Sequence, residues 1–387
     1  MGDIMKKMIK KILFSILGLL LVVIVVAGSY VGYILLSYKR IGDVSLEISS
    51  NSTLEKVNVN EEYSISTYNI GFGAYSQDYT FFLDTGYDIN GNETVGHYGK
   101  AKNKDEVLFN TNGSIETMKS LNVDFMLLQE VDIKSTRSYK VNQNELFVNE
   151  FKTYDNVFAI NFDSAFLPYP LYDMHGKSLA GLSTFSKYQI KEASRKQYTI
   201  SESLSKFFDL DRCFSIQRIE VSNNKNLFIV NSHMSAYDKG GVIRKKQIEE
   251  LNYFLLSHQD DYIIVGGDFN HDLLTYNPEF NYTNENKPFN NVLKDPDWVS
   301  PYFTSNKKSL LVNNFKVVAS DNEPTCRNND IAWNPDLTYK CVVDGFIVSS
   351  NIEVINHYNV KTNNGNLNID GFAYSDHQPA YMSFILK

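Results

Sequence analysis

The feature that most constrains the fold is a short apolar segment, ending in glycine or polar residues, that recurs along most of the chain. The clearest copies are "YSISTYNIGFG", "VDFMLLQEVD", "AGLSTFSK", "LFIVNSHM", "YIIVGGDFN", "CVVDGFIVS" and "AYMSFIL". Segments of this length, rich in β-branched and aromatic residues and bounded by turn formers, are typical of buried β-strands. Many strands with a few intervening helices predict an α/β fold with helices packed outside the sheets.

One helix has a clear periodic signal, from Val242 to His258. Apolar residues at helical spacing predict an inner face, and the charged residues between them predict a solvated one. The predicted inner face consists of Ile248, Leu251 and Leu255, and the predicted outer face of Arg244, Lys245, Glu249 and Glu250.

The N-terminal part of the chain predicts a membrane anchor. Ile12–Tyr38 has no charged residue, and as a helix it would rise roughly 40 Å, enough to cross a bilayer. Lysines precede this run at Lys6, Lys7, Lys10 and Lys11, so the positive-inside rule places the N-terminus in the cytoplasm and the rest of the chain outside. A cleaved signal peptide is the alternative, but its apolar core would be shorter.

These features predict four sections: a basic cytoplasmic N-terminus (1–11), a transmembrane anchor (12–38), a polar linker (39–60) and one α/β domain (61–387). Two aperiodic stretches, Tyr75–Asp105 and Thr275–Asn329, are expected to be long loops, which are usually functional or disordered. The aromatic residues of the first favour an ordered loop near a site.

Charge and cysteine content exclude some functions. A formal charge of -8 argues against a broad basic surface for nucleic acid, although a local basic groove is compatible with it. The three cysteines are too few and too scattered for a disulfide framework or a zinc site. A bridge between Cys326 and Cys341 is left open.

Polar and ionisable residues gather at the ends of the predicted strands. Each one alone fits a turn, where Asp, Asn and Gly are common. If the strands lie side by side, however, their ends meet at one edge and form a cleft. The residues at these ends are Asn69, Glu130, His233, Asp268, Asn270, Asp344, Asp376 and His377.

Several carboxylates in one cleft would repel one another unless a cation lay between them. Oxygen ligands without cysteine favour Mg²⁺ or Mn²⁺, and Mg²⁺ usually keeps waters and binds substrate phosphate. The two histidines would remain available to the substrate. The pattern therefore predicts metal-dependent hydrolysis of a phosphate ester.

The order of these motifs resembles the endonuclease/exonuclease/phosphatase superfamily, which includes pancreatic-type deoxyribonucleases, abasic-site endonucleases, neutral sphingomyelinases and inositol polyphosphate 5-phosphatases. The resemblance runs from Tyr63 to Phe384 and is strongest in "QEVD", "GGDFN" and "SDHQP". It implies a four-layered α/β sandwich with two packed central sheets and a site at one edge.

The resemblance also implies roles for the strand-end residues. Glu130, Asn69 and Asp376 would hold the metal, Asp268 would orient or deprotonate the attacking water, and Asn270 would hold the phosphate. His377, oriented by Asp344, would contact the scissile phosphate, and His233 points to the deoxyribonuclease and sphingomyelinase branches. Gly266 and Gly267 are expected to let the substrate approach Asp268 closely.

The substrate is less constrained than the reaction. Arg137, Arg212 and Arg327 are candidate phosphate clamps, although each could equally be a surface arginine. An external, membrane-tethered domain fits a phospholipid or a nucleic acid as substrate, and no protein partner is predicted. The alternative from another class is a binding module that kept the fold and lost catalysis.

Overall fold

The strands form two large mixed sheets in the computed structural model, which describes residues 2–207, 209–290, 292–365 and 370–387. The first sheet runs in the spatial order β17 (Ile352–Asn359), β18 (Ala380–Leu386), β3 (Glu62–Asn69), β6 (Phe125–Asp132), β8 (Leu179–Ser186), β7 (Asp155–Asp163) and β2 (Ile48–Ser49). The second runs in the order β1 (Val44–Ser45), β9 (Glu192–Gln197), β10 (Cys213–Glu220), β11 (Asn226–His233), β12 (Tyr262–Asp268), β16 (Asp344–Ser349) and β13 (Phe315–Val318).

A parallel pair of strands lies near the middle of each sheet. In the first sheet β3 and β6 are parallel, and in the second β11 and β12 are parallel. Parallel strands end at the same edge of a sheet, and accordingly His233 lies opposite Asp268 in the register of β11 and β12. The next strand, β16, is antiparallel and starts at that edge, with Asp344 opposite Asp268.

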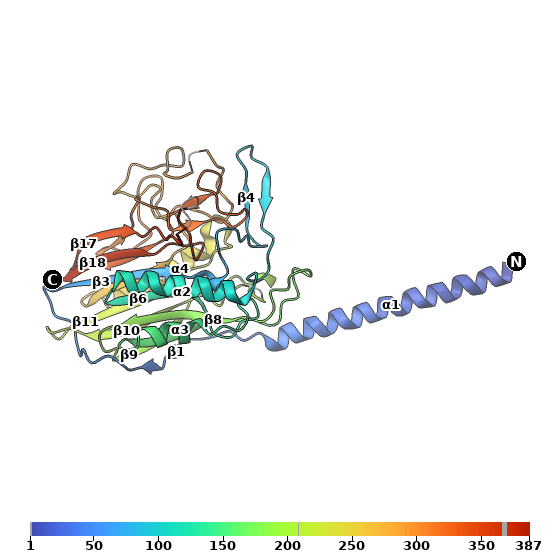
Figure 1. Cartoon of the computed structure of the whole chain (residues 1–387), viewed down its shortest axis with the longest axis horizontal. Coiled ribbons are helices and arrows are strands. Elements are labelled where there is room, and N and C mark those ends of the chain that lie inside the picture. The colour runs from blue at the N-terminus through green and yellow to red at the C-terminus, as the bar shows by residue number, and fades with distance from the viewer. Residues whose placement is uncertain (1, 208, 291, 366–369) are drawn as a thin grey trace.

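The two sheets pack face to face with helices on their outer sides, as Figure 1 shows. Ile65 and Leu127 of the first sheet meet Ile229 and Ile264 of the second in a buried apolar layer. Helices α2 (Lys104–Leu121) and α3 (Gln143–Glu150) cover the outer face of the first sheet, and α4 (Val242–Ser257) covers that of the second. The expected four-layered α/β sandwich is therefore confirmed.

The helix predicted at Val242–His258 is confirmed as α4, which ends one residue earlier. Ile248, Leu251 and Leu255 are buried against the second sheet as expected. The prediction for Arg244 was wrong, because this side chain is fully buried. Its guanidinium donates to the carbonyl oxygens of Ser235, Ala236 and Trp298, so it joins two loops instead of facing solvent.

The long stretches expected to be loops contain regular structure. Tyr75–Asp105 includes the hairpin of β4 (Thr85–Tyr87) and β5 (Glu93–Val95) and ends in the first turn of α2. The order expected from its aromatic residues is present, because Tyr75, Tyr79 and Phe81 belong to a buried cluster. The second stretch includes β13 and β14 (Cys326–Arg327), which pairs with β15 (Lys340–Cys341). The three 3₁₀ helices of the described residues are η1 (Gly71–Gly73), η2 (Leu204–Phe207) and η3 (Lys239–Gly241).

The cysteines do not form a bridge. Cys326 and Cys341 lie opposite each other in the β14–β15 pair, but both are free and buried, as is Cys213.

The N-terminal residues form α1 (Gly2–Ser37), a helix long and apolar enough to cross a membrane. It projects away from the domain in Figure 1. Residues 39–60, expected to be a polar linker, lie along the domain, because β1 pairs with β9 and β2 pairs with β7. Arg40 also forms a salt bridge with Asp211, whose carboxylate accepts a hydrogen bond from the backbone N–H of Ile41 over 2.6 Å.

Candidate active site

Asn69 and Glu130 lie where β3 and β6 reach the site edge of the first sheet. The Asn69 side-chain Nδ2 donates to Glu130 Oε1 over 3.3 Å and to Asp268 Oδ2 over 3.1 Å. The Asn69 Oδ1 accepts from the backbone N–H of Gly71 over 3.0 Å, which fixes the orientation of the amide. One amide therefore joins carboxylates that come from both sheets.

The backbone at Glu130 departs from a regular strand. Its φ is 53°, and it lies in a β-bulge between Leu128 and Val131. Positive φ is costly for a residue with a side chain and is frequently found at functional sites. The bulge directs the Glu130 carboxylate toward Asn69.

Asp268, at the end of β12, is contacted by side chains from both sheets, by Asn69 of the first and His233 of the second. It is 1% exposed, and its Oδ2 lies 3.4 Å from His233 Nε2 and 3.8 Å from His377 Nε2. Its Oδ1 accepts from the backbone N–H of Asn270 over 2.9 Å, and the Asn270 side chain donates to the carbonyl of Met234. Burial raises the pKa of Asp268, but the two imidazoles and the Asn270 N–H outweigh burial and lower it.

The two glycines before Asp268 serve strand packing, which differs from the role expected of them. A Cβ on Gly267 would lie 1.9 Å from the carbonyl oxygen of Ser232, in the neighbouring strand β11. A Cβ on Gly266 would lie 2.6 Å from Leu127, in the opposite sheet. Gly267 lets the neighbouring strand β11 approach β12 closely, and Gly266 does the same for the opposite sheet.

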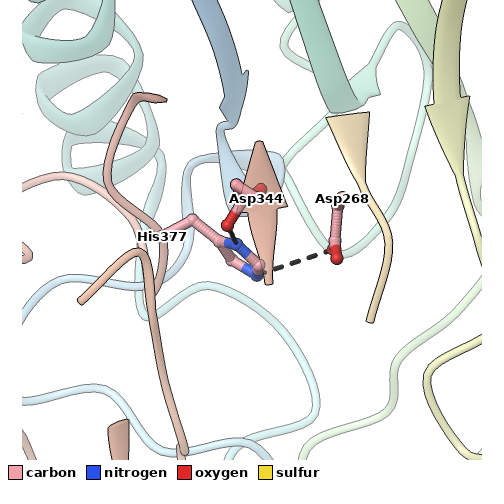
Figure 2. A group of neighbouring side chains, drawn as sticks. All are labelled: Asp268, Asp344 and His377. Atoms are coloured by element: carbon pink, nitrogen blue, oxygen red, sulfur yellow. Dashed lines mark hydrogen bonds and ion pairs between the residues drawn. The ribbon is translucent and has the colours of Figure 1, made fainter. Parts of the chain in front are cut away.

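His377 lies between two aspartates, as Figure 2 shows. Its Nδ1 is 2.8 Å from Asp344 Oδ2, and its Nε2 faces Asp268. Burial lowers the pKa of His377, but the adjacent Asp344 and Asp268 carboxylates outweigh burial and raise it well above the usual value. The imidazole is thereby oriented by one carboxylate and directed at the other.

Asp376 lies on the first-sheet side of the site. Its Oδ2 accepts from Asn329 Nδ2 over 2.8 Å, and its Oδ1 accepts from the Ser375 hydroxyl over 3.2 Å. Burial raises its pKa, and although His377 opposes this rise, the negative charge of Glu130 adds to it. A Cβ on Gly71 would lie 2.8 Å from Asp376 Oδ1, so only glycine fits there without a shift.

The three candidate arginines are all buried, but their partners differ. Arg137 forms a two-pronged salt bridge with Asp132, at 3.1 and 2.8 Å, and lies over the Phe72 ring. Arg212 and Arg327 are 2% and 1% exposed, and the Nε and Nη1 atoms of each have no hydrogen-bond partner among the described residues. Arg212 and Arg327 therefore retain donors for an anion, whereas Asp132 already occupies the fork of Arg137.

The site opens into a cavity of about 700 Å³, lined by Glu130, Asp268 and His377 together with Arg212 and Arg327. The eight strand-end residues predicted from the sequence thus lie in one region. Six of them line the cavity, and the other two contact it indirectly, because Asn69 is hydrogen-bonded to Asp268 and Asp344 to His377. Their individual roles stay predictions.

Three residues of the site were missed from the sequence: Asp84, Tyr237 and Asn329. The Tyr237 hydroxyl donates to Asp84 over 2.8 Å, and Asn329 Nδ2 lies between Asp84 and Asp376, at 3.1 and 2.8 Å. Burial raises the pKa of Asp84 to about 7, while Tyr237 and Asn329 oppose the rise. All three lie in irregular segments, so no strand end marked them.

The side chains fit a hard divalent cation. Glu130 and Asp376 form no salt bridge with lysine or arginine in the described part of the chain, and the nearest ion-pair partner of Glu130 is His233 Nε2 at 3.9 Å. Asp268, Asp344 and His377 also each offer an atom within 4.8 Å of the others, but a hydrogen bond already joins His377 Nδ1 to Asp344. The carboxylate oxygens of Glu130 and Asp376 therefore suit Mg²⁺ or Mn²⁺ better, whereas Asn69, predicted as a ligand, turns its side-chain NH2 to Glu130 and its oxygen to the Gly71 N–H.

Two stacked sheets with acidic and imidazole side chains at one edge characterise metal-dependent hydrolases of phosphate esters. The chain belongs to the Endonuclease/Exonuclease/phosphatase family, whose model matches residues 107–377.

Solved structures of this family share the fold. ANGEL2, described as a 2′,3′-cyclic phosphatase and crystallised with adenosine-2′,3′-vanadate, superposes with a TM-score of 0.52 at 14% identity, over 89% of this chain and 99% of that chain. TDP2 of D. rerio with a single-strand DNA product has a TM-score of 0.50 at 12% identity, over 84% and 99%. A family protein from Leptotrichia buccalis has 0.50 at 15%, over 83% and 99%. No curated protein matches the chain significantly in sequence. At identities this low, the superpositions show only that the fold is shared. The branch of the family to which the chain belongs therefore stays a prediction.

Proposed function

We propose that the chain is a membrane-anchored, divalent-metal-dependent phosphodiesterase whose catalytic domain faces the outside of the cell. The observation that carries this proposal is the arrangement around Asp268, a buried carboxylate that faces two imidazoles at 3.4 and 3.8 Å in a cavity lined by arginines. The neighbours with a DNA product and a cyclic-nucleotide analogue have the same fold, which agrees with a phosphate-ester substrate.

In this proposal Asp268 activates the attacking water. Its lowered pKa keeps it ionised at neutral pH, so it can accept a proton as the water oxygen bonds to phosphorus. The ester P–O bond breaks in the same displacement, and the leaving alcohol takes up a proton. His233, whose Nε2 faces the same carboxylate, is placed to supply that proton. One water is consumed, and the products are an alcohol and a phosphate monoester.

The remaining groups bind and orient the phosphate. His377 is held by Asp344 and can donate from Nε2 to a phosphoryl oxygen. Arg212 and Arg327 supply N–H donors that have no protein partner among the described residues. Asn270 fixes the position of Asp268 through its backbone N–H. Donors placed in advance around developing negative charge account for a large share of enzymatic rate enhancement.

Glu130 and Asp376 would hold the Mg²⁺ or Mn²⁺, and Asn69 would assist by orienting Glu130 through its side-chain amide. When bound, the ion neutralises charge on the phosphoryl oxygens and helps to orient the ester.

Membrane anchoring through α1 is supported by its length, its apolar composition and the exposure of its apolar stretch outside the domain. The lysines before it support a cytoplasmic N-terminus. Protease added to intact cells should digest the domain. Protection until the cells are lysed would contradict the orientation.

The catalytic proposal is tested on the full-length protein in detergent with a chromogenic phosphodiester and Mg²⁺ or Mn²⁺. We expect chelation to abolish hydrolysis, and Asp268→Ala to lower kcat/KM at least about a hundredfold. Asp260→Ala, at an exposed position in a turn, is the matched control and should retain activity. Activity that survives chelation would contradict the metal assignment, and an inactive wild-type protein would favour the binding module.

A further inference from the structure

An exposed apolar surface lies beside the mouth of the cavity. We call Phe166, Tyr169, Leu171, Tyr172 and Met174 the apolar rim. Leu171 is 74% exposed and Tyr172 is 65% exposed, although both are large apolar or aromatic side chains. Clusters of this kind on a protein surface usually mark contact with a membrane or a partner.

The apolar rim is attached to the end of α1. The Tyr30 hydroxyl donates to the Phe166 carbonyl over 3.0 Å, and the Phe166 N–H donates to the Tyr33 hydroxyl over 3.0 Å. Just after the helix, Tyr38 packs edge-on against Phe207. The salt bridge between Arg40 and Asp211 holds the following residues against the domain. Two hydrogen bonds therefore join α1 to Phe166 of the rim, and the other two contacts hold the end of the helix against the rest of the domain.

The length of α1 sets the depth of the rim. Tyr30 follows Lys11 by 19 residues, which as a helix is about 28 Å, close to the ~30 Å of a bilayer's hydrocarbon core. With Lys11 at the cytoplasmic interface, Tyr30 and Tyr33 lie at the opposite interface, where tyrosines are enriched. Phe166 is bonded to both tyrosines. Phe166 then lies at the level of the lipid headgroups, and the remaining rim residues follow it within eight positions of the chain.

The mouth of the cavity lies at the same level. Tyr30 of α1 and Tyr169 of the rim both line the cavity, together with Leu83, which is 44% exposed and precedes β4. In Figure 1, β4 and the point where α1 leaves the domain lie at the same end of the molecule. The same cavity reaches Glu130 and Asp268. A headgroup phosphate can therefore reach the site while its acyl chains remain in the bilayer.

We propose that the apolar rim docks on the outer leaflet and that the substrate is the phosphodiester of a membrane phospholipid. This inference rests on the proposed function and on α1 as anchor. A nucleic acid is disfavoured, because the chain carries a net charge of -8 and the arginines that line the cavity are buried, whereas Leu83 and Tyr169 of the same lining are exposed. Hydrolysis adds one water across a P–O bond of the lipid and releases an alcohol and a phosphate monoester.

Activity on two substrates separates docking from chemistry. Full-length protein is reconstituted in vesicles of phosphatidylcholine, phosphatidylethanolamine and phosphatidylglycerol, and lipid hydrolysis is compared with hydrolysis of the soluble chromogenic ester. The triple variant Leu171→Ser, Tyr172→Ser, Met174→Ser changes only rim residues that do not line the cavity. We expect it to lose at least about tenfold on vesicle lipid and to stay within about twofold on the soluble ester. Tyr253→Ser, 80% exposed on α4, is the matched control and should change neither rate.

A fluorescence measurement tests docking without activity. Leu171→Trp in vesicles should be quenched by lipids that carry a quencher near the headgroup, whereas Tyr253→Trp should not. Equal quenching at both positions, or an equal loss by the triple variant on both substrates, would overturn the proposal. So would faster hydrolysis of a single-stranded oligodeoxynucleotide than of any vesicle lipid. If the soluble ester is not hydrolysed at all, the proposed function fails, and the quenching still decides whether the rim docks.

Discussion

Replacing Asp344 by asparagine removes one charge from the site without changing its volume. The Asp344 carboxylate is fully buried, and His377 Nδ1 lies 2.8 Å from its Oδ2. A hydrogen bond to a charged group contributes about 1.5–3 kcal/mol. If the bond is fully used in the transition state, its loss lowers kcat/KM about 10- to 150-fold.

The size of this loss should depend on pH. Burial lowers the pKa of His377, but Asp344 and Asp268 outweigh it and raise the pKa, so the wild-type imidazolium persists to high pH. In Asp344→Asn the pKa of His377 falls, and the proton is lost at lower pH. The kcat/KM of the variant should therefore be closest to that of the wild type at pH values below the lowered pKa of its His377. The difference in kcat/KM should grow as the pH rises through that pKa.

The assay is kcat/KM for the soluble chromogenic ester between about pH 5 and 9 at saturating metal, with thermal unfolding measured in parallel. Asp155→Asn is the control, because Asp155 is also fully buried but accepts from the backbone of Asn51, Ser52 and Ile190, away from the cavity. It should lower stability and spare kcat/KM. A loss below about threefold in Asp344→Asn, or one that does not change with pH, would refute the reasoning.

Three further outcomes follow from the geometry. Gly71→Ala should lower kcat/KM at least about tenfold, because φ is +52° and the new Cβ would lie 2.8 Å from Asp376 Oδ1; unchanged kinetics would contradict the steric argument. Arg327→Gln should raise KM with little change in the free energy of unfolding. Arg137→Gln breaks a buried ion pair and should lower the free energy of unfolding by about 3–5 kcal/mol. The reverse pattern would assign substrate binding to Arg137 and a structural role to Arg327. Glu130→Gln should raise the Mg²⁺ concentration needed for half-maximal activity at least about tenfold, and an unchanged metal titration would remove Glu130 from the metal site.

Much of the site could be predicted from the sequence because its residues follow buried strands. The strand ends at Asn69, His233 and Asp268 are marked by apolar runs, and parallel pairing brings such ends to one edge. Helix α4 was visible for a similar reason, since its apolar residues recur at helical spacing.

Other features left no such signal. Helix α2 buries Asn110, Thr111 and Ser114 beside its apolar residues, so no continuous apolar stripe appears in the sequence. Strands β1 and β2 have two residues each, too few for an alternation to be seen. Asp84 and Asn329 approach the site from loops, and only the packing of those loops places them.

The position of Glu130 shows how local backbone irregularity sets the chemistry. Leu127 faces the layer between the sheets and Leu128 faces the outer helices, as alternation requires. Gln129 points inward again, to Asn231 in the other sheet.

Strict alternation would then send Glu130 outward and Val131 inward, yet Val131 packs in the outer layer. The bulge therefore inserts Glu130 as the extra residue, and its positive φ directs the carboxylate to the strand end. Without the bulge, the same sequence would aim this carboxylate at the apolar layer under α2 and α3. The proposed metal site thus depends on the one-residue β-bulge at Glu130 as much as on the identity of its ligands.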